Sequence, residues 1–323
     1  MTADRPEALA SALARVLGGA EVGALEHLSG GASRETWSFT ASSGNGAPRT
    51  LIVQLQRPGS EGDVEVEASL LQVARTAGVP VPEVLAASMQ TDALGAPFLI
   101  VTAVAGETIP RRILRNDAFG TARAALPAQL AGALAALHAV TPRAVPGLTA
   151  PDQVRQCRDA LDQHGQPHPA FELGFRWLAA NRPADDRPAA RRTTIVHGDF
   201  RLGNFVVDER GLVAVLDWEL AHIGDPMEDL GWLCIRAWRF GGALPAAGLA
   251  GYDELFDAYA DASGCVVDPA VVRWWEVLGT LKWGIMGIMQ ASAHLTGTSR
   301  SHELAVIGRR VCENEHDLLV LLD

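Results

Sequence analysis

Short apolar runs of β type dominate the first hundred residues of the chain. The runs TWSFTA, TLIVQLQ and PFLIVTAV lie between about Ala24 and Thr102, and one helical run, Val64 to Ala77, is inserted among them. The turn-rich segment SSGNGAP, Ser42 to Pro48, separates the first two runs. It predicts a hairpin whose strands are antiparallel neighbours, so we expect a small sheet that carries one helix.

Beyond Gly106 the chain becomes rich in alanine and leucine, and its apolar spacing becomes helical. The run LPAQLAGALAALHAV, Leu126 to Val140, is typical of this part, and similar patterns fill most of the remainder. Two β-like segments interrupt the helices, namely TTIVHGDF, which ends at Phe200, and NFVVDERGLVAVLDW, which folds back at the turn Asp208 to Gly211.

These patterns predict an α+β protein of two lobes. The first lobe, residues 1–102, would hold an N-terminal helix and a small antiparallel sheet. The second lobe, residues 103–323, would be larger and mainly helical. With 323 residues and 48% hydrophobic content, the chain can bury a core of this size.

Composition narrows the classes of partner. The formal net charge of −11 disfavours a general affinity for nucleic acid. No stretch reaches the roughly 18 uninterrupted apolar residues of a membrane span, and MTADRPEALA has no leader pattern, so we expect a cytoplasmic protein with no membrane partner. The four cysteines lack paired spacings, which predicts buried free thiols in a reducing compartment. The sequence leaves the oligomeric state open.

Candidate chemistry gathers at the two β-like segments of the second lobe. In HGDFRLGN, Asp199 and Asn204 have the Asp-x-x-x-x-Asn spacing of kinase catalytic loops. Asp199 would accept the proton of an attacking hydroxyl, and Asn204 would offer its amide oxygen to magnesium. Asp217 opens the segment DWE after the next strand, where a second metal ligand is needed. An Asp-Asn pair also caps helices or stabilises turns, but three such residues in this order favour catalysis.

The pattern HGDFRLGN...VLDWELAHIGDPMEDLGW, within Leu28 to Ala237, resembles the aminoglycoside phosphotransferase-like family. Members of that family share a bilobal, protein-kinase-like fold. The resemblance implies a catalytic base at Asp199, magnesium ligands at Asn204 and Asp217, and residues that support the loop at His197 and Arg201. It also implies two structural acids, Asp225 and Asp229.

Two residues near this motif have a structural interpretation. Asp225 precedes a proline and the helical run MEDLGWLCIRAW, so we favour a helix N-cap over direct catalysis. His138 lies near the end of an alanine-rich helix without an adjacent acid or nucleophile. We therefore predict that it makes a buried hydrogen bond outside the site.

The same resemblance implies a nucleotide site in the first lobe. In LSGGASRETWSF, Gly30, Gly31 and Ser33 would form the loop over the phosphates, although glycine pairs also mark ordinary turns. Glu67 would take the place of the glutamate that pairs with a strand lysine in kinases, or it is a solvated helix charge. Thr102 and Val104 would bind adenine through their backbone at a hinge, unless FLIVTAVAG is a plain buried strand.

One position departs from the family pattern. The strand LIVQLQRPG has Gln54 where a basic residue should reach the α- and β-phosphates. Arg57 would compensate only if the strand end is bulged or its register is shifted. Two functions follow: an ATP- and Mg²⁺-dependent kinase, or a nucleotide- or metabolite-binding pseudokinase with little transfer activity.

The acceptor is expected to be a hydroxyl of a small molecule. An aminoglycoside would require a dense acidic pocket, and the acids beyond Phe240 are scattered. The chain is also similar to the kinase-like domains associated with acyl-CoA dehydrogenases, so hydroxyacyl compounds and other metabolites are alternatives. No activation segment is recognisable, which disfavours protein substrates.

Overall fold

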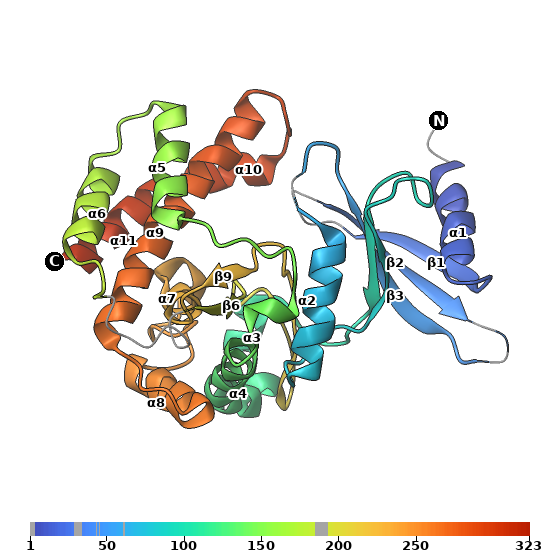
Figure 1. Ribbon diagram of the computed structural model, residues 1–323, viewed down its shortest axis with the longest axis horizontal. Coiled ribbons are helices and arrows are strands. Elements are labelled where there is room, and N and C mark those ends of the chain that lie inside the picture. The colour runs from blue at the N-terminus through green and yellow to red at the C-terminus, as the bar shows by residue number, and fades with distance from the viewer. Residues whose placement is uncertain (1–3, 29–33, 43, 45, 61, 185–192) are drawn as a thin grey trace.

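A computed structural model describes residues 4–28, 34–42, 44, 46–60, 62–184 and 193–323 of the chain. Figure 1 shows a smaller lobe, which contains the sheet with α1 and α2, beside a larger helical lobe. The strands are β1 (Glu21–Leu28), β2 (Arg34–Ser42), β3 (Arg49–Gln56), β4 (Val84–Ser88), β5 (Phe98–Thr102), β6 (Thr194–Val196), β7 (Phe205–Asp208), β8 (Gly211–Val215) and β9 (His222–Gly224). The α-helices are α1 (Asp4–Val16), α2 (Val64–Thr76), α3 (Pro110–Arg115), α4 (Gly120–His138), α5 (Gln153–His164), α6 (Pro169–Ala180), α7 (Met227–Cys234), α8 (Tyr252–Ser263), α9 (Pro269–Leu295), α10 (His302–Gly308) and α11 (Val311–Leu322).

The sheet of the smaller lobe has five antiparallel strands in the order β1-β2-β3-β5-β4. β2 and β3 pair without a register shift, from Arg34 opposite Gln56 to Ala41 opposite Arg49, which confirms the predicted hairpin. The sequence pattern did not predict β1 or β4. β1 is an edge strand with an irregularity after Gly23 and mostly exposed positions, so it lacks an alternating apolar signal.

Helix α2 packs against the sheet and begins at a regular N-cap. The Asp63 carboxylate accepts hydrogen bonds from the N–H groups of Glu65 (2.8 Å) and Val66 (3.2 Å). Glu67 follows in the first turn, and it is buried. A buried carboxylate requires a partner, so the interpretation of Glu67 as a solvated helix charge is wrong.

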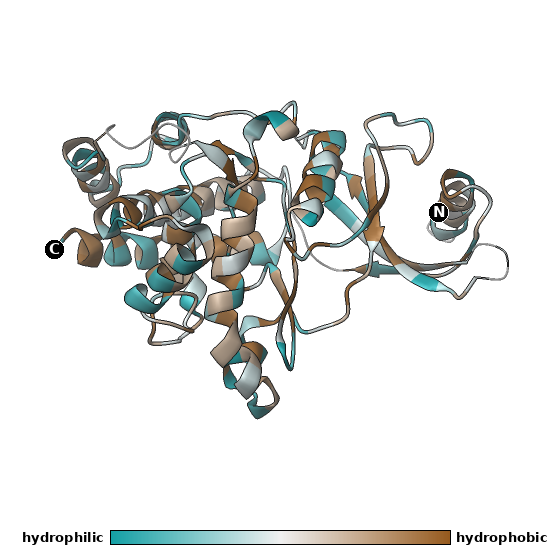
Figure 2. Ribbon diagram, turned by 60° about the horizontal axis from the view of Figure 1, so that its bottom comes forward, coloured by the Kyte–Doolittle hydropathy of each residue, from teal (hydrophilic) through white to brown (hydrophobic). Residues whose placement is uncertain are grey.

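The larger lobe is built on α4 and α9 and contains two short antiparallel strand pairs. β7 pairs with β8 through the predicted turn Asp208 to Gly211, and β6 pairs with β9. In Figure 2 the helices change between brown and teal along their length, as expected of helices that bury one face. The loop between β6 and β7 carries HGDFRLGN.

The described helices include none that is both long and apolar enough to cross a membrane. All four cysteines are free thiols, as predicted. Cys157 and Cys234 are buried, whereas Cys265 is half-buried and Cys312 is exposed. The expectation that all of them are buried is therefore wrong for the last two.

Close packing of α7 on α9 requires a glycine. A Cβ added at Gly231 would lie 2.7 Å from Trp275 Cβ and 2.8 Å from the backbone nitrogen of Glu276. We expect Gly231→Ala to lower the free energy of unfolding by about 1–3 kcal/mol because the helices must separate. Urea denaturation measures this change. The matched control is Gly132→Ala in α4, where nothing lies within 4 Å of the added carbon and a gain of about 0.5–1 kcal/mol is expected. Equal effects of the two substitutions would contradict the packing argument.

Candidate active site

The loop from His197 to Asn204 is anchored by a buried carboxylate from α7. Asp229 accepts hydrogen bonds from the backbone N–H groups of His197 (2.8 Å) and Gly198 (2.9 Å). Gly198 has φ +77°, and a Cβ there would lie 2.4 Å from Leu220 O. A glycine is therefore required at this turn, and Asp229 fixes the direction in which the loop leaves β6.

His197 is buried and supports the loop from within. Its Nε2 lies 3.0 Å from Leu216 O, and its Nδ1 accepts a hydrogen bond from the Asp199 N–H at 3.2 Å. Burial lowers the pKa of His197. A neutral ring protonated on Nε2 satisfies both contacts. The His197 side chain therefore links the loop to the strand segment that precedes Asp217.

The Asp199 carboxylate is held by three side-chain donors. Oδ1 accepts from Arg201 Nε at 2.9 Å and from Trp232 Nε1 at 2.8 Å, while Oδ2 accepts from Asn204 Nδ2 at 2.7 Å. The Arg201 guanidinium in turn lies over the Trp238 ring, 4.5 Å from its centroid. These contacts fix the orientation of the carboxylate, and the indole of Trp232 is a participant that the sequence did not indicate.

Along the chain, Asn204 comes just before the β7–β8 hairpin and Asp217 comes just after it. Both hydrogen bonds of the Asn204 side chain to Asp199 use its amide nitrogen, which directs its oxygen elsewhere. Asp217 has φ +65°, a left-handed conformation that aspartate tolerates better than most residues. Asp217 is exposed at the cavity. The protein atoms around its carboxylate still desolvate it in part, and this desolvation, with the carboxylates of Glu219 and Asp199, raises its pKa to about 7. A cation would relieve this repulsion.

A cavity of about 280 Å³ separates the lobes. The segment that follows the sheet crosses into the larger lobe and pairs with β7 through Glu107 and Val207, at 2.8 and 3.0 Å. The cavity therefore has the sheet on one side and β7 and the end of β8 on the other. Its lining, mostly apolar, includes Leu28, Ile52, Gln54, Glu67, Leu99, Val101, Thr102, Val104, Val206, Leu216, Asp217 and Trp218.

The structure thus brings together most of the residues proposed for the nucleotide site. This cavity is lined by five of them, namely Gln54, Glu67, Thr102, Val104 and Asp217. Gly30, Gly31 and Ser33, proposed for the phosphate loop, lie outside the described residues.

The basic residue expected near Gln54 comes from an unexpected strand. Arg34 of β2 donates from Nη1 to Gln54 Oε1 at 2.8 Å and forms an ion pair with Glu67. Arg57 lies beyond the end of β3 and is exposed. The bulge or register shift that would have brought Arg57 inward does not occur, because the β2–β3 pairing is regular.

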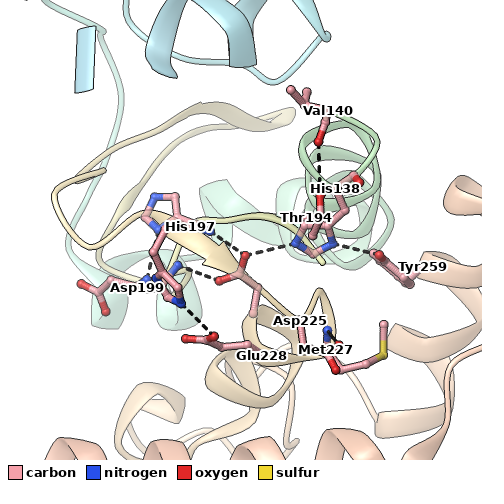
Figure 3. A network of polar contacts seen from close by, with 12 residues as sticks. His138, Val140, Thr194, His197, Asp199, Asp225, Met227, Glu228 and Tyr259 are labelled. Carbon is pink, nitrogen blue, oxygen red and sulfur yellow. Dashed lines mark hydrogen bonds and ion pairs between the residues drawn. The ribbon is translucent and has the colours of Figure 1, made fainter. Parts of the chain in front are cut away.

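His138 and Asp225 were both predicted to have structural roles. His138 makes buried contacts from Nδ1 to Tyr259 Oη (2.8 Å) and from Nε2 to Asp229 (3.2 Å), which confirms its role as a hydrogen-bonding residue outside the site (Figure 3). Asp225 accepts from the Met227 N–H at 3.0 Å, at the start of α7. The N-cap residue of α7 is Pro226, however, so the prediction that Asp225 is the N-cap is wrong by one residue.

The two lobes, the loop and the cavity between them define a small-molecule kinase of the bilobal, protein-kinase-like class. Residues 24–275 match the phosphotransferase enzyme family, and the chain belongs to that family. Human acyl-CoA dehydrogenase family member 11 is 26% identical over 317 residues, which cover 86% of this chain and 39% of the human protein. Mouse acyl-CoA dehydrogenase family member 10 is 29% identical over 207 residues, 58% of this chain and 18% of the mouse protein. The chain spans less than two fifths of the length of these relatives.

Solved structures share the fold at low identity. A Ralstonia eutropha protein grouped with the aminoglycoside phosphotransferases has a TM-score of 0.71 at 21% identity, covering 92% of both chains. A choline/ethanolamine kinase family protein from Mesorhizobium loti has a TM-score of 0.66 at 21% identity, over 100% of this chain and 95% of the other. Aminoglycoside phosphotransferase APH(4)-Ia, in a complex with AMP-PNP and hygromycin B, has a TM-score of 0.64 at 18% identity, over 96% and 98%. The predicted protein-kinase-like fold is confirmed.

Proposed function

We propose that this protein transfers the γ-phosphoryl group of ATP, with magnesium, to a hydroxyl of a small molecule, and that Asp199 is the catalytic base. The observation that carries the proposal is the position of Asp217, which lines a mostly apolar cavity between two lobes, next to the hydrogen-bonded pair Asp199 and Asn204. The backbone oxygen of Asn204 accepts the N–H of Leu216, which lines the same cavity, at 2.8 Å. Apolar walls with a few polar groups at one end suit a nucleotide, whose base is flat and whose phosphates are charged.

Adenine would lie in the cavity between the sheet and β7. The N–H of Thr102 already donates to Glu83 O at 2.9 Å, so this residue would offer adenine its carbonyl oxygen, and Val104 would supply the neighbouring N–H. Val101, Val206 and Leu216, which line the cavity, would contact the faces of the base. The phosphates would then extend toward Asp217.

Magnesium fits the polar end of the cavity. The charged form of Asp217 is disfavoured by desolvation and by its carboxylate neighbours, and the nitrogen of Asn204 is bonded to Asp199. The carboxylate of Asp217 and the amide oxygen of Asn204 are therefore the groups that would hold a hard cation. The other ligands would be phosphate and water oxygens, as is usual for this ion. When bound, magnesium would neutralise charge on the phosphates and so stabilise the transition state.

The chemical step requires little covalent participation by the protein. The oxygen of the acceptor hydroxyl forms a bond to the γ-phosphorus, the bond from that phosphorus to the bridging β–γ oxygen breaks, and ADP leaves. Asp199 orients the hydroxyl and takes its proton. Arg201, Trp232 and Asn204 hold the carboxylate in one rotamer, which reduces the entropic cost of alignment.

The acceptor is proposed as an alcohol group of a metabolite. Because the full-length relatives are named as acyl-CoA dehydrogenase family members, hydroxyacyl compounds are the first class to test. Aminoglycosides are the second class, because APH(4)-Ia was crystallised with hygromycin B. The pseudokinase alternative predicts nucleotide binding without turnover of either class.

Magnesium-dependent nucleotide binding tests the site before the acceptor is known. We expect calorimetry to detect ATP binding that requires magnesium in the wild type, and Asp217→Asn to weaken it about 10- to 100-fold because a charged ligand is lost. Asparagine is preferred to alanine because it tolerates the positive φ of this residue.

The matched control is Asp257→Asn, an exposed aspartate in α8, which should bind as the wild type does. Phosphorylation of a hydroxyacyl compound or of an aminoglycoside would establish the kinase. ATP binding without phosphorylation of any alcohol would favour the pseudokinase. A folded wild-type protein that binds no ATP would refute the nucleotide site.

A further inference from the structure

Arg34 forms a buried bridge between the sheet and α2. It lies on β2 opposite Gln56, and its side chain reaches diagonally to Gln54 on β3. Nη1 donates to Gln54 Oε1 at 2.8 Å and to Glu67 Oε1 at 3.1 Å, and Nη2 donates to Glu67 Oε2. The side chains of Arg34 and Glu67 are only 12% and 9% exposed. The guanidinium is thus held in place by contacts on two elements.

The position of this guanidinium relates it to the nucleotide site. Gln54 and Glu67, its two partners, line the interlobe cavity together with Asp217. Arg34 Nε lies 3.9 Å from the carboxylate of Glu219, in the same DWE segment as Asp217. A phosphate chain that runs from the apolar end of the cavity to Asp217 would therefore pass the guanidinium, whose planar N–H groups match phosphate oxygens.

We propose that Arg34 of β2 binds the α- and β-phosphates of the nucleotide, in place of the basic residue that β3 lacks. This assignment rests on the proposed nucleotide site. A guanidinium has five N–H groups, and within the described part of the chain Arg34 donates three hydrogen bonds, all to Gln54 and Glu67. One N–H of Nη2 and the Nε–H, which lies 3.9 Å from the Glu219 carboxylate and so forms an ion pair without a hydrogen bond, are then the donors for phosphate oxygens.

The same geometry explains why residue 54 is a glutamine. The side-chain oxygen of Gln54 accepts a hydrogen bond from the Arg34 guanidinium, so a lysine there would place a second cation against the first. Gln54 is therefore a positioning residue. The cation beside Glu67 comes from β2 instead of β3, so one cation is still present there. Arg57, exposed beyond the end of β3, has no comparable contact with the cavity lining.

Binding of magnesium·AMP-PNP, compared with binding of adenosine, tests the assignment. In Arg34→Gln we expect the affinity for magnesium·AMP-PNP, measured by calorimetry, to fall about 10- to 100-fold. The affinity for adenosine, measured by ligand-observed NMR, should be unchanged because adenosine has no phosphate. Adding Gln54→Lys to Arg34→Gln should restore most of the lost affinity, since it returns a cation to β3 beside Glu67.

Arg57→Gln is the matched control and should bind both ligands as the wild type does. Thermal unfolding checks that each variant is folded. If Arg34→Gln does not fold, the double variant Arg34→Gln with Glu67→Gln is compared instead, because it also removes the buried Glu67 charge that Arg34→Gln leaves unpaired. Wild-type affinity in the folded Arg34 variant, or an equal loss for adenosine and AMP-PNP, would overturn the role of Arg34 alone. A folded wild type that does not bind magnesium·AMP-PNP would overturn the proposed function and, with it, this assignment.

Discussion

Replacing Asp199 with asparagine is expected to lower kcat for phosphoryl transfer by about 10²–10⁴-fold, the usual contribution of a general base. Asparagine has nearly the same shape but cannot take the proton of the acceptor hydroxyl. Nucleotide binding should change little, because the proposed magnesium ligands are Asn204 and Asp217. The measurement is kcat with an alcohol that the wild type phosphorylates, together with the affinity for magnesium·AMP-PNP.

Trp232→Phe provides a graded comparison for Asp199→Asn. It removes one donor to the carboxylate, the 2.8 Å hydrogen bond from Nε1, and leaves the carboxylate itself. A loss of one such hydrogen bond corresponds to about 2- to 10-fold in rate. If Asp199→Asn retained more than a tenth of wild-type kcat, or if both variants lost activity equally, Asp199 would not be the base.

The loop of the site was predictable because its chemistry is local in sequence. Asp199 and Asn204 are five residues apart and touch each other directly. His197, immediately before Gly198, also serves the same loop. Spacing therefore indicated Asp199 and Asn204, and position after the next strand indicated Asp217, whereas the family resemblance added His197.

Contacts between distant segments could not be predicted in this way. Trp232 is 33 residues from Asp199, and Arg34 is 20 residues from Gln54. Each contact depends on how an element packs or on a strand register, and neither leaves a signal in the local pattern. The sequence did show that residue 54 is not basic. It could not show that Arg34 lies beside Gln54, because that contact depends on the diagonal pairing of β2 and β3.

Asp229, which the resemblance implies is a structural acid, holds the loop before β7 from inside the protein. It is fully buried, and it accepts from two backbone N–H groups of the loop that carries Asp199 and from His138. Burial alone would raise the pKa of Asp229, but the hydrogen bond and charge of His138, with the contacts from His197, hold the pKa below its ordinary value of 3.8. The ionised carboxylate therefore ties α4 and α7 to the loop that carries Asp199.

Asp229→Ala is accordingly expected to lower the free energy of unfolding by about 3–5 kcal/mol, since it leaves several buried donors without a partner. Urea denaturation at pH 7 measures this loss. The contribution from ionisation is complete above the unfolded-state pKa of 3.8 and disappears as the pH falls through the lower folded-state pKa, because the unfolded chain then binds the proton first. Asp257→Ala, an exposed aspartate in α8, should change stability by less than about 0.5 kcal/mol. Equal stability of the two variants would mean that the loop is held by other contacts, and a stable Asp229→Ala protein with wild-type kcat would show that the anchoring of His197 and Gly198 is dispensable for the site.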